Sequence, residues 1–382
     1  MKLVKSSVAP LLVMLFLVAG VASAAPTFTI LDIGPVGPAG SVTDINDSGQ
    51  VVGRALFPGF TYYHAYVWSG GVMTDLGTLG YNYDSRAEGI NNSTDVVGYY
   101  RQNPPGDNDH RAVIWSGGIG TDIGTLGGAE ATASYVSDSG QIVGTSVTSA
   151  QGGPWHGFLL DAGVWTDLGA LPNPTPYPWY ENSSNAYSMN SQGQIVGDSY
   201  VDRSSVEDPQ HAVLFFNGWV QDLGTLGGQW SSAFSINEKG DIVGYASDAD
   251  EAGRAFIWTD GNMTELGTLG GSESAAYDID ELGQIVGWAD VGGDLQRHAF
   301  LWEGGLMTDL NTLIPDNTGW LLSEARALND IGWIAGIGTY QGARHGFILT
   351  PVGAVPAPGA LILGFFGVGI VTLSKRRFRS NN

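Results

Sequence analysis

The chain has 382 residues, of which 38 are Asp or Glu and only 16 are Lys or Arg, so its formal net charge is −22. Such an acidic surface repels phosphates, which argues against nucleic acids and anionic membrane surfaces as partners. The 57 glycines and 17 prolines favour short strands and tight turns over helices, and the lack of cysteine excludes disulfides.

Residues 1–24 have the three parts of a secretory signal peptide. The basic start, the apolar run and the small-residue cleavage site are Lys2 with Lys5, residues 11–21, and Ala22-Ser23-Ala24. We expect cleavage before Ala25 and export of the remaining chain. Without disulfides, its stability must come from packing and from hydrogen bonds within sheets.

One phrase recurs seven times through the body of the chain. An acidic residue followed by Leu/Ile-Gly-Thr-Leu-Gly leads to Ile-Asn-x-x-Gly-Gln-Ile-Val-Gly and then to His-Ala-Phe-Leu-Trp. The last glycine of the middle phrase recurs every 43 to 53 residues, at Gly53, Gly98, Gly144, Gly197, Gly244, Gly287 and Gly336. This period predicts one repetitive body over residues 25–350 instead of two or three unrelated domains.

Each repeat contains four segments that have the residue pattern of short strands and are joined by tight turns. A three-residue turn such as Asp47-Ser48-Gly49 joins the first segment to the second, and Ser69-Gly70-Gly71 joins the third to the fourth. Glycine at these places accepts the positive φ that an antiparallel hairpin needs. Four short antiparallel strands in about 45 residues are typical of one propeller blade.

The two ends of the repeat region are out of phase with the repeat. Residues 28–37 align with residues 73–80 through Asp32 and Asp75, so the region begins on a fourth segment, and it ends on a third segment at 345–350. Because third and fourth segments form a hairpin in every other repeat, we expect the first strand to pair with the last. We therefore predict an all-β fold, a seven-bladed propeller closed by its terminal strands. The alternative is an open β-solenoid.

The repeat region resembles the bacterial extracellular HAF-repeat family. The resemblance covers about residues 28–350, and its clearest copies are His298-Ala299-Phe300-Leu301-Trp302 and Leu266-Gly267-Thr268-Leu269-Gly270-Gly271. Arg254 replaces the histidine in one copy. The family implies an exported repeat protein, and it brings no known reaction with it.

Histidines and acids recur with the repeat, which argues against a catalytic role for them. We assign all six histidines of the chain to the start of the third segment, at His64, His110, His156, His211, His298 and His345. A metal site gathers its ligands, whereas these residues are spread one to a unit, so structural hydrogen bonds are expected. The alternative is a ring of histidines lining a central channel. One acid per unit, expected to cap a turn or strand end, is found at Asp32, Asp75, Asp122, Asp167, Asp222, Glu265 and Asp309.

The loops between the second and third segments vary in length and are rich in acids. The carboxylate oxygens of Asp248, Asp250 and Glu251 are candidate calcium ligands, although this loop lacks the pattern of an EF-hand. The alternative is a set of acids that are simply solvated.

Two loops carry several aromatic residues, and we regard them as candidate ligand-binding loops. Tyr177, Trp179 and Tyr180 lie in the longest insertion, residues 172–187, and Phe57, Phe60 and Tyr62 lie in a second loop. Their rings would stack on sugars or on a protein partner. The alternative is that they fold back over the blade edges.

The C-terminal tail is similar to the PEP-CTERM sorting signal. It consists of a Pro-x-Pro motif (Val355, Pro356, Ala357 and Pro358, within 351–358), an uncharged apolar stretch at 359–374, and a basic end at 375–382 with Lys375, Arg376, Arg377 and Arg379. The resemblance implies recognition by exosortase, a membrane transpeptidase of bacteria. Ala357 stands where the family most often has glutamate. We expect residues 359–374 to anchor the chain in the membrane as a helix before processing, with the basic end in the cytoplasm. The alternative is a plain membrane anchor.

No Gly-x-Ser-x-Gly, His-Glu-x-x-His or phosphate-binding loop is present in the sequence. We therefore expect an exported protein of the bacterial cell surface or polysaccharide matrix that is not an enzyme, has no cofactor except possible calcium, and binds a glycan or protein through its loops. Two alternatives stay open: an enzyme acting on polysaccharide, a lyase or hydrolase, with its site in the central channel, and a purely structural surface scaffold.

Overall fold

The computed structural model describes residues 28–104, 109–150, 152–172, 183–201, 209–292, 296–316 and 318–352. The predicted signal peptide, the sorting motif, the apolar stretch 359–374 and the basic end lie outside these ranges, and so do Tyr177, Trp179 and Tyr180. Among the residues that are described, no helix is long and apolar enough to cross a bilayer.

The regular elements of the described residues are all β-strands apart from one turn of 3-10 helix, η1 (Leu310–Thr312). The strands are β1 (Phe28–Pro35), β2 (Ser41–Ile45), β3 (Val51–Ala55), β4 (His64–Ser69), β5 (Val72–Asp75), β6 (Ser85–Ile90), β7 (Val96–Arg101), β8 (His110–Ser116), β9 (Ile119–Gly124), β10 (Ala131–Val136), β11 (Ile142–Val147), β12 (Trp155–Asp161), β13 (Val164–Asp167), β14 (Ser184–Met189), β15 (Ile195–Tyr200), β16 (Gln210–Phe216), β17 (Trp219–Gly224), β18 (Gly227–Ile236), β19 (Ile242–Asp248), β20 (Gly253–Thr259), β21 (Asn262–Gly267), β22 (Gly270–Ile279), β23 (Ile285–Val291), β24 (Arg297–Glu303), β25 (Leu306–Asp309), β26 (Trp320–Leu328), β27 (Ile334–Tyr340) and β28 (Ala343–Pro351).

Each repeat forms an antiparallel set of four strands, which we call a unit. Units 1 to 6 are β2–β5, β6–β9, β10–β13, β14–β17, β18–β21 and β22–β25, and unit 7 consists of β26, β27, β28 and β1. Five units are separate sheets. Units 4 and 5 are joined into one sheet of eight strands, but only through a single parallel pair, Gln210 with Trp230.

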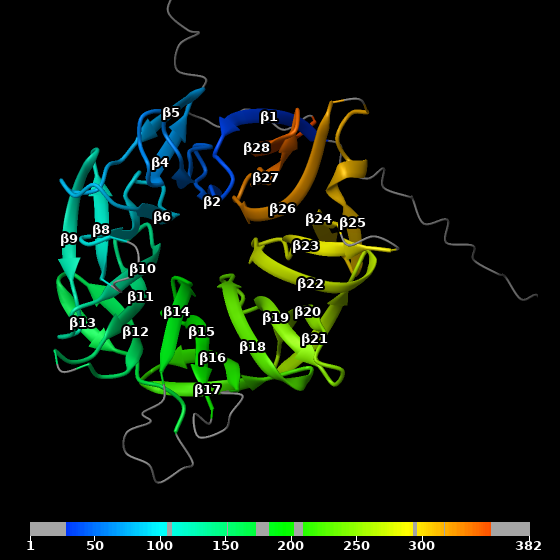
Figure 1. The fold of residues 1–382 in the computed structure, drawn as a ribbon. Helices are drawn as coiled ribbons and strands as arrows, with labels where there is room; N and C mark the ends of the chain where they lie inside the picture. The colour runs from blue at the N-terminus through cyan, green and yellow to red at the C-terminus, as the bar shows by residue number, and fades with distance from the viewer. Residues whose placement is uncertain are drawn as a thin grey trace, which may run out of the picture.

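The units are arranged around a central opening, as in a propeller (Figure 1). The first strands of the units, β2, β6, β10, β14, β18, β22 and β26, lie nearest this opening, and each contacts the first strand of the next unit. Strand β26 in turn contacts β2. Short antiparallel strands joined by tight turns satisfy their backbone hydrogen bonds within one unit, which is why each repeat can form its own sheet.

The last unit contains both ends of the repeat region. Strand β1 pairs with β28 in antiparallel fashion, with Asp32 opposite Phe347. Asp75 lies opposite Tyr66 in the same way between β5 and β4 of unit 1. The predicted pairing of the first strand with the last is therefore confirmed. Strand β1 is the fourth strand of unit 7, and the other three strands of that unit come from the end of the repeat region.

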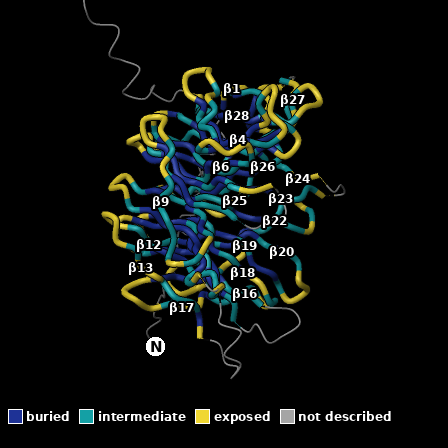
Figure 2. The backbone as a smooth tube through the Cα atoms, turned by 60° about the vertical axis from the view of Figure 1, so that its left-hand side comes forward, coloured by how far each residue is buried: buried dark blue, intermediate teal, exposed yellow. Residues whose placement is uncertain are grey.

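Apolar side chains pack between neighbouring units, so that each unit buries part of its apolar surface against the next unit. Trp68 of unit 1 packs with Ala335, Ile337 and Ile348 of unit 7, and Trp115 of unit 2 belongs to a cluster that includes Val52 of unit 1. Figure 2 shows buried strands in the body and exposed turns at its edges. These tryptophans, which lie in the third strands of their units, therefore serve as packing contacts between units.

The glycine that ends each middle phrase has a steric reason. A Cβ atom at Gly98 would lie 1.9 Å from the carbonyl oxygen of Arg86 on the first strand, and the other six glycines show the same approach at 1.9 to 2.2 Å. A β-bulge lies directly beside each of these contacts, for example at Glu88 between Ala87 and Gly89. A bulge inserts one unpaired residue and redirects its side chain. The repeat thus builds one bulged position into the first strand of every unit.

Candidate functional site

The repeated histidines join the third strand of a unit to its fourth. The Nδ1 atom of each lies 2.7 to 2.9 Å from the carboxylate of the repeated acid: His64 with Asp75, His156 with Asp167, His211 with Asp222, His298 with Asp309, and His345 with Asp32. The last pair links the two ends of the repeat region. These contacts support the structural interpretation over a ring of histidines in the channel.

The assignment of His110 to this position is wrong. Arg111 occupies this position. It directly precedes Ala112, which corresponds to the alanine of His-Ala-Phe, and its side chain meets the repeated acid. Its Nε and Nη2 atoms bind the two carboxylate oxygens of Asp122 at 2.9 and 3.1 Å. His110 is displaced by one residue and packs edge-on against Tyr99, with ring centroids 4.6 Å apart.

The repeated acids also cap turns, as predicted. Asp75 accepts a hydrogen bond from the backbone N–H of Gly77 at 2.7 Å, and Asp167 and Asp222 do the same for Gly169 and Gly224 at 2.8 Å. Burial acts to raise the pKa of these three carboxyls, but the bonds from histidine and glycine outweigh it and hold the pKa below its ordinary value. Carboxylates committed in this way are ionised structural groups.

The acidic loop considered for calcium is a turn held by its own contacts. One carboxylate oxygen of Asp248 accepts from the backbone N–H groups of Asp250 and Ala252 at 2.9 and 3.0 Å, and the other binds Nε of Arg254 at 2.9 Å. The Arg254 contact lowers the pKa of Asp248. Within the described ranges, no group of three or more His, Cys, Asp or Glu is placed to hold a metal ion.

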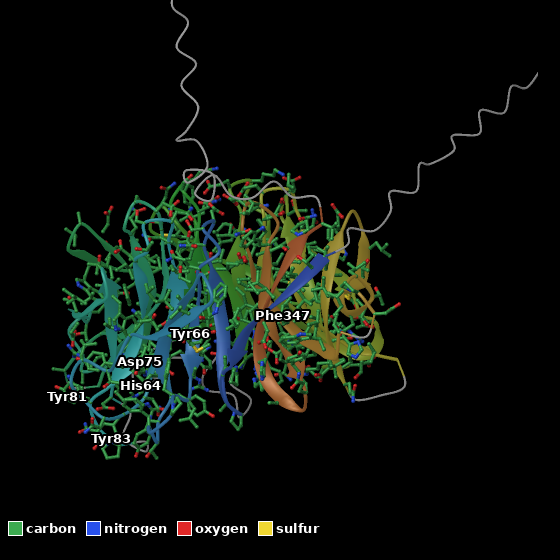
Figure 3. The ribbon with its side chains drawn as sticks, turned by 90° about the horizontal axis from the view of Figure 1, so that it is seen from above. His64, Tyr66, Asp75, Tyr81, Tyr83 and Phe347 are labelled. Carbon is green, nitrogen blue, oxygen red and sulfur yellow. The ribbon has the colours of Figure 1, made fainter. Side chains whose placement is uncertain are left out.

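Aromatic residues from two loops and one strand meet at the edge of units 1 and 2. We call Phe57, Phe60, Tyr62, Tyr81, Tyr83 and Tyr100 the aromatic patch. Tyr62 contacts Tyr83 edge-on at 5.6 Å, and Tyr81 stacks on Tyr100 at 5.6 Å. Phe60 lies 4.4 Å from the ring of His64. Tyr81 and Tyr83 project beyond the His64–Asp75 pair at one edge of the molecule (Figure 3).

The aromatic patch keeps part of its surface open. Phe60 is 51% exposed and Tyr81 is 39% exposed, whereas Phe57 packs against the core of units 1 and 7. Phe57, Phe60 and Tyr62 were predicted from the sequence as ligand-binding residues, whereas Tyr81 and Tyr83 were not. The signal was present: Tyr81 follows Leu-Gly-Thr-Leu-Gly at a place where several other repeats have a second glycine.

A cavity of about 1030 Å³ lies between the first strands of all seven units. At one mouth, asparagine side chains join neighbouring units. The Nδ2 atoms of Asn46, Asn91, Asn190, Asn237 and Asn329 donate to the backbone carbonyls of Asn91, Ser137, Asn237, Asp280 and Asn46, respectively, at 3.0 to 3.1 Å. The Ile-Asn pair of the repeat therefore serves to hold units together.

Acidic side chains surround the same mouth. Asp47, Asp138, Glu238, Glu281 and Asp330 line it, and Asp47 accepts from the backbone N–H of Asp330 at 3.1 Å. Burial and the like charges of Asp47 and Glu281 raise the pKa of Asp330. At this mouth, hydrogen bonds therefore link neighbouring units, and the acidic side chains create a negative electrostatic potential.

Two further carboxylates lie in the cavity wall. Burial raises the pKa of Asp44 to about 7 and that of Asp278 to about 6. Asp44 accepts from the backbone N–H groups of Ile45 and Ile90 at 2.7 and 2.8 Å. Asp278 accepts from Leu328 N–H of unit 7 at 2.9 Å. Each carboxylate thus bridges its own unit to the next.

Comparison with known proteins finds no matching family and no matching curated protein. Solved structures with a similar fold include TolB from Acinetobacter baumannii, at 11% identity and a TM-score of 0.40 over 81% of this chain and 78% of that one. A gluconolactonase from Xanthomonas campestris is 12% identical, with a TM-score of 0.39 over 86% and 91%. AofleA from Arthrobotrys oligospora is 12% identical, with a TM-score of 0.39 over 74% and 87%. Likeness this low carries no argument about activity.

Proposed function

We propose that the chain is a seven-bladed β-propeller, each unit being one blade, closed by the pairing of β1 with β28. The contact of β26 with β2 and the links from Asn329 to Asn46 and from Asp330 to Asp47 support this closure. Closure hides the two edges that an open array would expose. Export by the N-terminal signal and sorting by exosortase at the tail are parts of the same proposal.

We further propose that this propeller binds a glycan of the cell surface or extracellular matrix without chemically changing it. The observation that supports this is the aromatic patch, where partly exposed rings from two loops are held in fixed positions by one another. A pyranose ring offers an apolar face of C–H groups that stacks on such rings. Rigid aromatic side chains lose little conformational entropy on binding, which favours affinity.

The enzyme alternative has one feature in its favour, the raised pKa values of Asp44 and Asp278 in the cavity wall. Both side chains, however, already accept backbone N–H groups from two units. This arrangement suits a brace between units better than a proton donor to a substrate. We therefore keep catalysis as the second candidate only.

The test is binding of the purified protein to the matrix polysaccharide of its host, measured by biolayer interferometry. Replacing two exposed rings, Phe60→Ala with Tyr81→Ala, is expected to weaken binding at least tenfold, which corresponds to about 1.4 kcal/mol. Trp219→Ala is the matched control, since Trp219 is 78% exposed on unit 4. Equal binding by both variants would contradict a site at the patch. New reducing ends or unsaturated sugars after incubation would show catalysis instead.

A further inference from the structure

The bulged position of the first strand lies in the wall of the central cavity in all seven units. The bulged residue of each unit lines the cavity, and in chain order these are Thr43, Glu88, Ser134, Tyr187, Phe234, Tyr277 and Arg326. The residue before the bulged one is Ala in six units and Val42 in unit 1, whereas the bulged residue itself is Thr, Glu, Ser, Tyr, Phe or Arg. A repeated scaffold that carries different side chains at one position is well suited to building a binding site.

Three consecutive units place aromatic rings side by side on this wall. Tyr187 and Phe234 have ring centroids 6.0 Å apart, and Phe234 and Tyr277 are 5.7 Å apart. Arg326 of the next unit stacks over Tyr277, with Cζ 4.1 Å from the ring centroid. We call Tyr187, Phe234 and Tyr277 the aromatic wall. These residues belong to β14, β18 and β22, which lie next to one another along the opening (Figure 1).

The aromatic wall is fixed in place before any ligand arrives. The hydroxyl of Tyr187 donates to Asp198 at 2.9 Å, and the hydroxyl of Tyr277 accepts from Nε1 of Trp288 at 3.0 Å. Each hydroxyl is therefore held by a hydrogen bond to another strand of its own unit, and both tyrosines line the cavity. Such pre-organisation lowers the entropic cost of binding.

Units 1 to 3, on the other side of the opening, supply a polar wall. Thr43, Glu88 and Ser134 are the bulged residues there. Arg86 also lines the cavity, and its Nε lies 3.0 Å from Oε1 of Glu88. Planar carboxylate and guanidinium groups are suited to hydrogen bonds with the paired hydroxyls of a sugar. One cavity thus has an apolar wall and a hydrogen-bonding wall.

From this arrangement we propose that the central cavity is a second binding site, independent of the aromatic patch, for a neutral pyranose unit of an oligosaccharide. A pyranose has the same division, an apolar ring face and a polar edge. The cavity volume of about 1030 Å³ is at the upper end of the range for small-ligand sites, which is enough for more than one sugar ring.

Charge in and around the cavity selects for a neutral ligand. The charges of Arg86 and Arg326 are balanced by the adjacent Glu88 and Glu324, so neither pair adds a net positive charge that would attract an anion. The acids at the mouth add a negative potential that repels one. A purely apolar ligand is also disfavoured, because it would strip water from the polar wall without replacing its hydrogen bonds.

The test is isothermal titration of the purified protein with three neutral trisaccharides, cellotriose, maltotriose and tri-N-acetylchitotriose, and with the anionic trigalacturonate. We expect at least one neutral sugar to bind, trigalacturonate to bind at least tenfold more weakly, and Phe234→Ala to weaken the neutral sugar at least tenfold. Phe234→Tyr, which keeps the ring, should retain binding, and Trp219→Ala is the matched surface control.

Three results would contradict the proposed cavity site. None of the three neutral sugars binds, trigalacturonate binds more tightly than they do, or binding is lost in the double variant Phe60→Ala with Tyr81→Ala and kept in Phe234→Ala. The last result would place the sugar on the aromatic patch and leave the proposed function intact. Thermal melting of Phe234→Ala separates unfolding from loss of the ring, and a folded Phe234→Ala protein that binds normally also contradicts the site.

Discussion

At the scale of single residues, the asparagine of the Ile-Asn pair has two tasks. In unit 7, Oδ1 of Asn329 accepts from the backbone N–H of Trp333 at 2.9 Å, and Nδ2 donates to the backbone carbonyl of Asn46 in unit 1 at 3.0 Å. The side chain is 5% exposed. It therefore holds its own turn and joins the last unit to the first.

Asn329→Ala is predicted to lower the free energy of unfolding by about 2 kcal/mol, because it removes one buried and one partly buried hydrogen bond and takes the acceptor from the backbone N–H of Trp333. Urea denaturation followed by tryptophan fluorescence measures the change. Asn82→Ala, at an exposed loop position, is the control and should alter stability by less than about 0.5 kcal/mol. Equal values for the two variants would show that the link to Asn46 adds nothing.

Ser137 offers the reverse experiment, since it occupies the asparagine position in unit 3 and has no amide to donate. Its hydroxyl already caps the turn by accepting from the backbone N–H of Gln141 at 3.0 Å. Ser137→Asn should keep that cap and add a bond to the carbonyl of Asn190, with a gain of about 1 kcal/mol in the same denaturation assay. A loss of stability would mean that units 3 and 4 are spaced differently from the linked pairs.

At the scale of elements, the pairing of β1 with β28 joins strands farther apart in the sequence than any other strand pairing in the described ranges. Thr29 lies opposite Thr350, and their hydroxyl oxygens are in contact. Because the chain has no cysteine, a pair introduced here has no competing partner within the same chain.

Thr29→Cys with Thr350→Cys is therefore predicted to close the repeat region covalently. Closing so long a loop restricts the unfolded chain, with an expected gain of about 4 kcal/mol. The melting temperature of the oxidised protein should exceed that of the same protein after reduction, and Thr29→Cys alone should show no such difference. If oxidation forms no intramolecular disulfide, or has no effect on melting, β1 does not pair stably with β28 in solution.

The sequence was sufficient to predict the four-strand units and the pairing of the terminal strands, because turn glycines and the phase of the repeat at Asp32 and His345 are local signals. It was insufficient for the cavity wall. Phe234 looks like any strand residue until the register shift between Ala233 and Ser235 shows that it is bulged. The assignment of His110 was wrong for a related reason, since a displacement of one residue changes which side chain meets the acid.

At the scale of the whole molecule, two sets of carboxyls have opposite effects on the pH dependence of stability. Asp75, Asp122, Asp167 and Asp222 have a lowered pKa, so the stability that they contribute is present above about pH 4 and is lost as pH falls below it. Asp44 and Asp278 have a raised pKa. Between about pH 4 and 7 the folded protein therefore binds more protons than the unfolded chain at these two sites, and stability falls as pH rises.

The second group, together with the repulsion within an acidic body, predicts maximum stability at mildly acidic pH. We expect the melting temperature at pH 5 to exceed that at pH 8 by on the order of 5 °C. Asp44→Asn should reduce this difference, because an amide keeps one acceptor oxygen in the wall without a titrating charge. Asp260→Asn removes the same charge from an exposed turn and should leave the difference almost unchanged. If Asp44→Asn melts with the pH dependence of the unmodified protein, Asp44 is ionised in the folded state throughout this range, and the destabilisation at high pH comes from the surface charge alone.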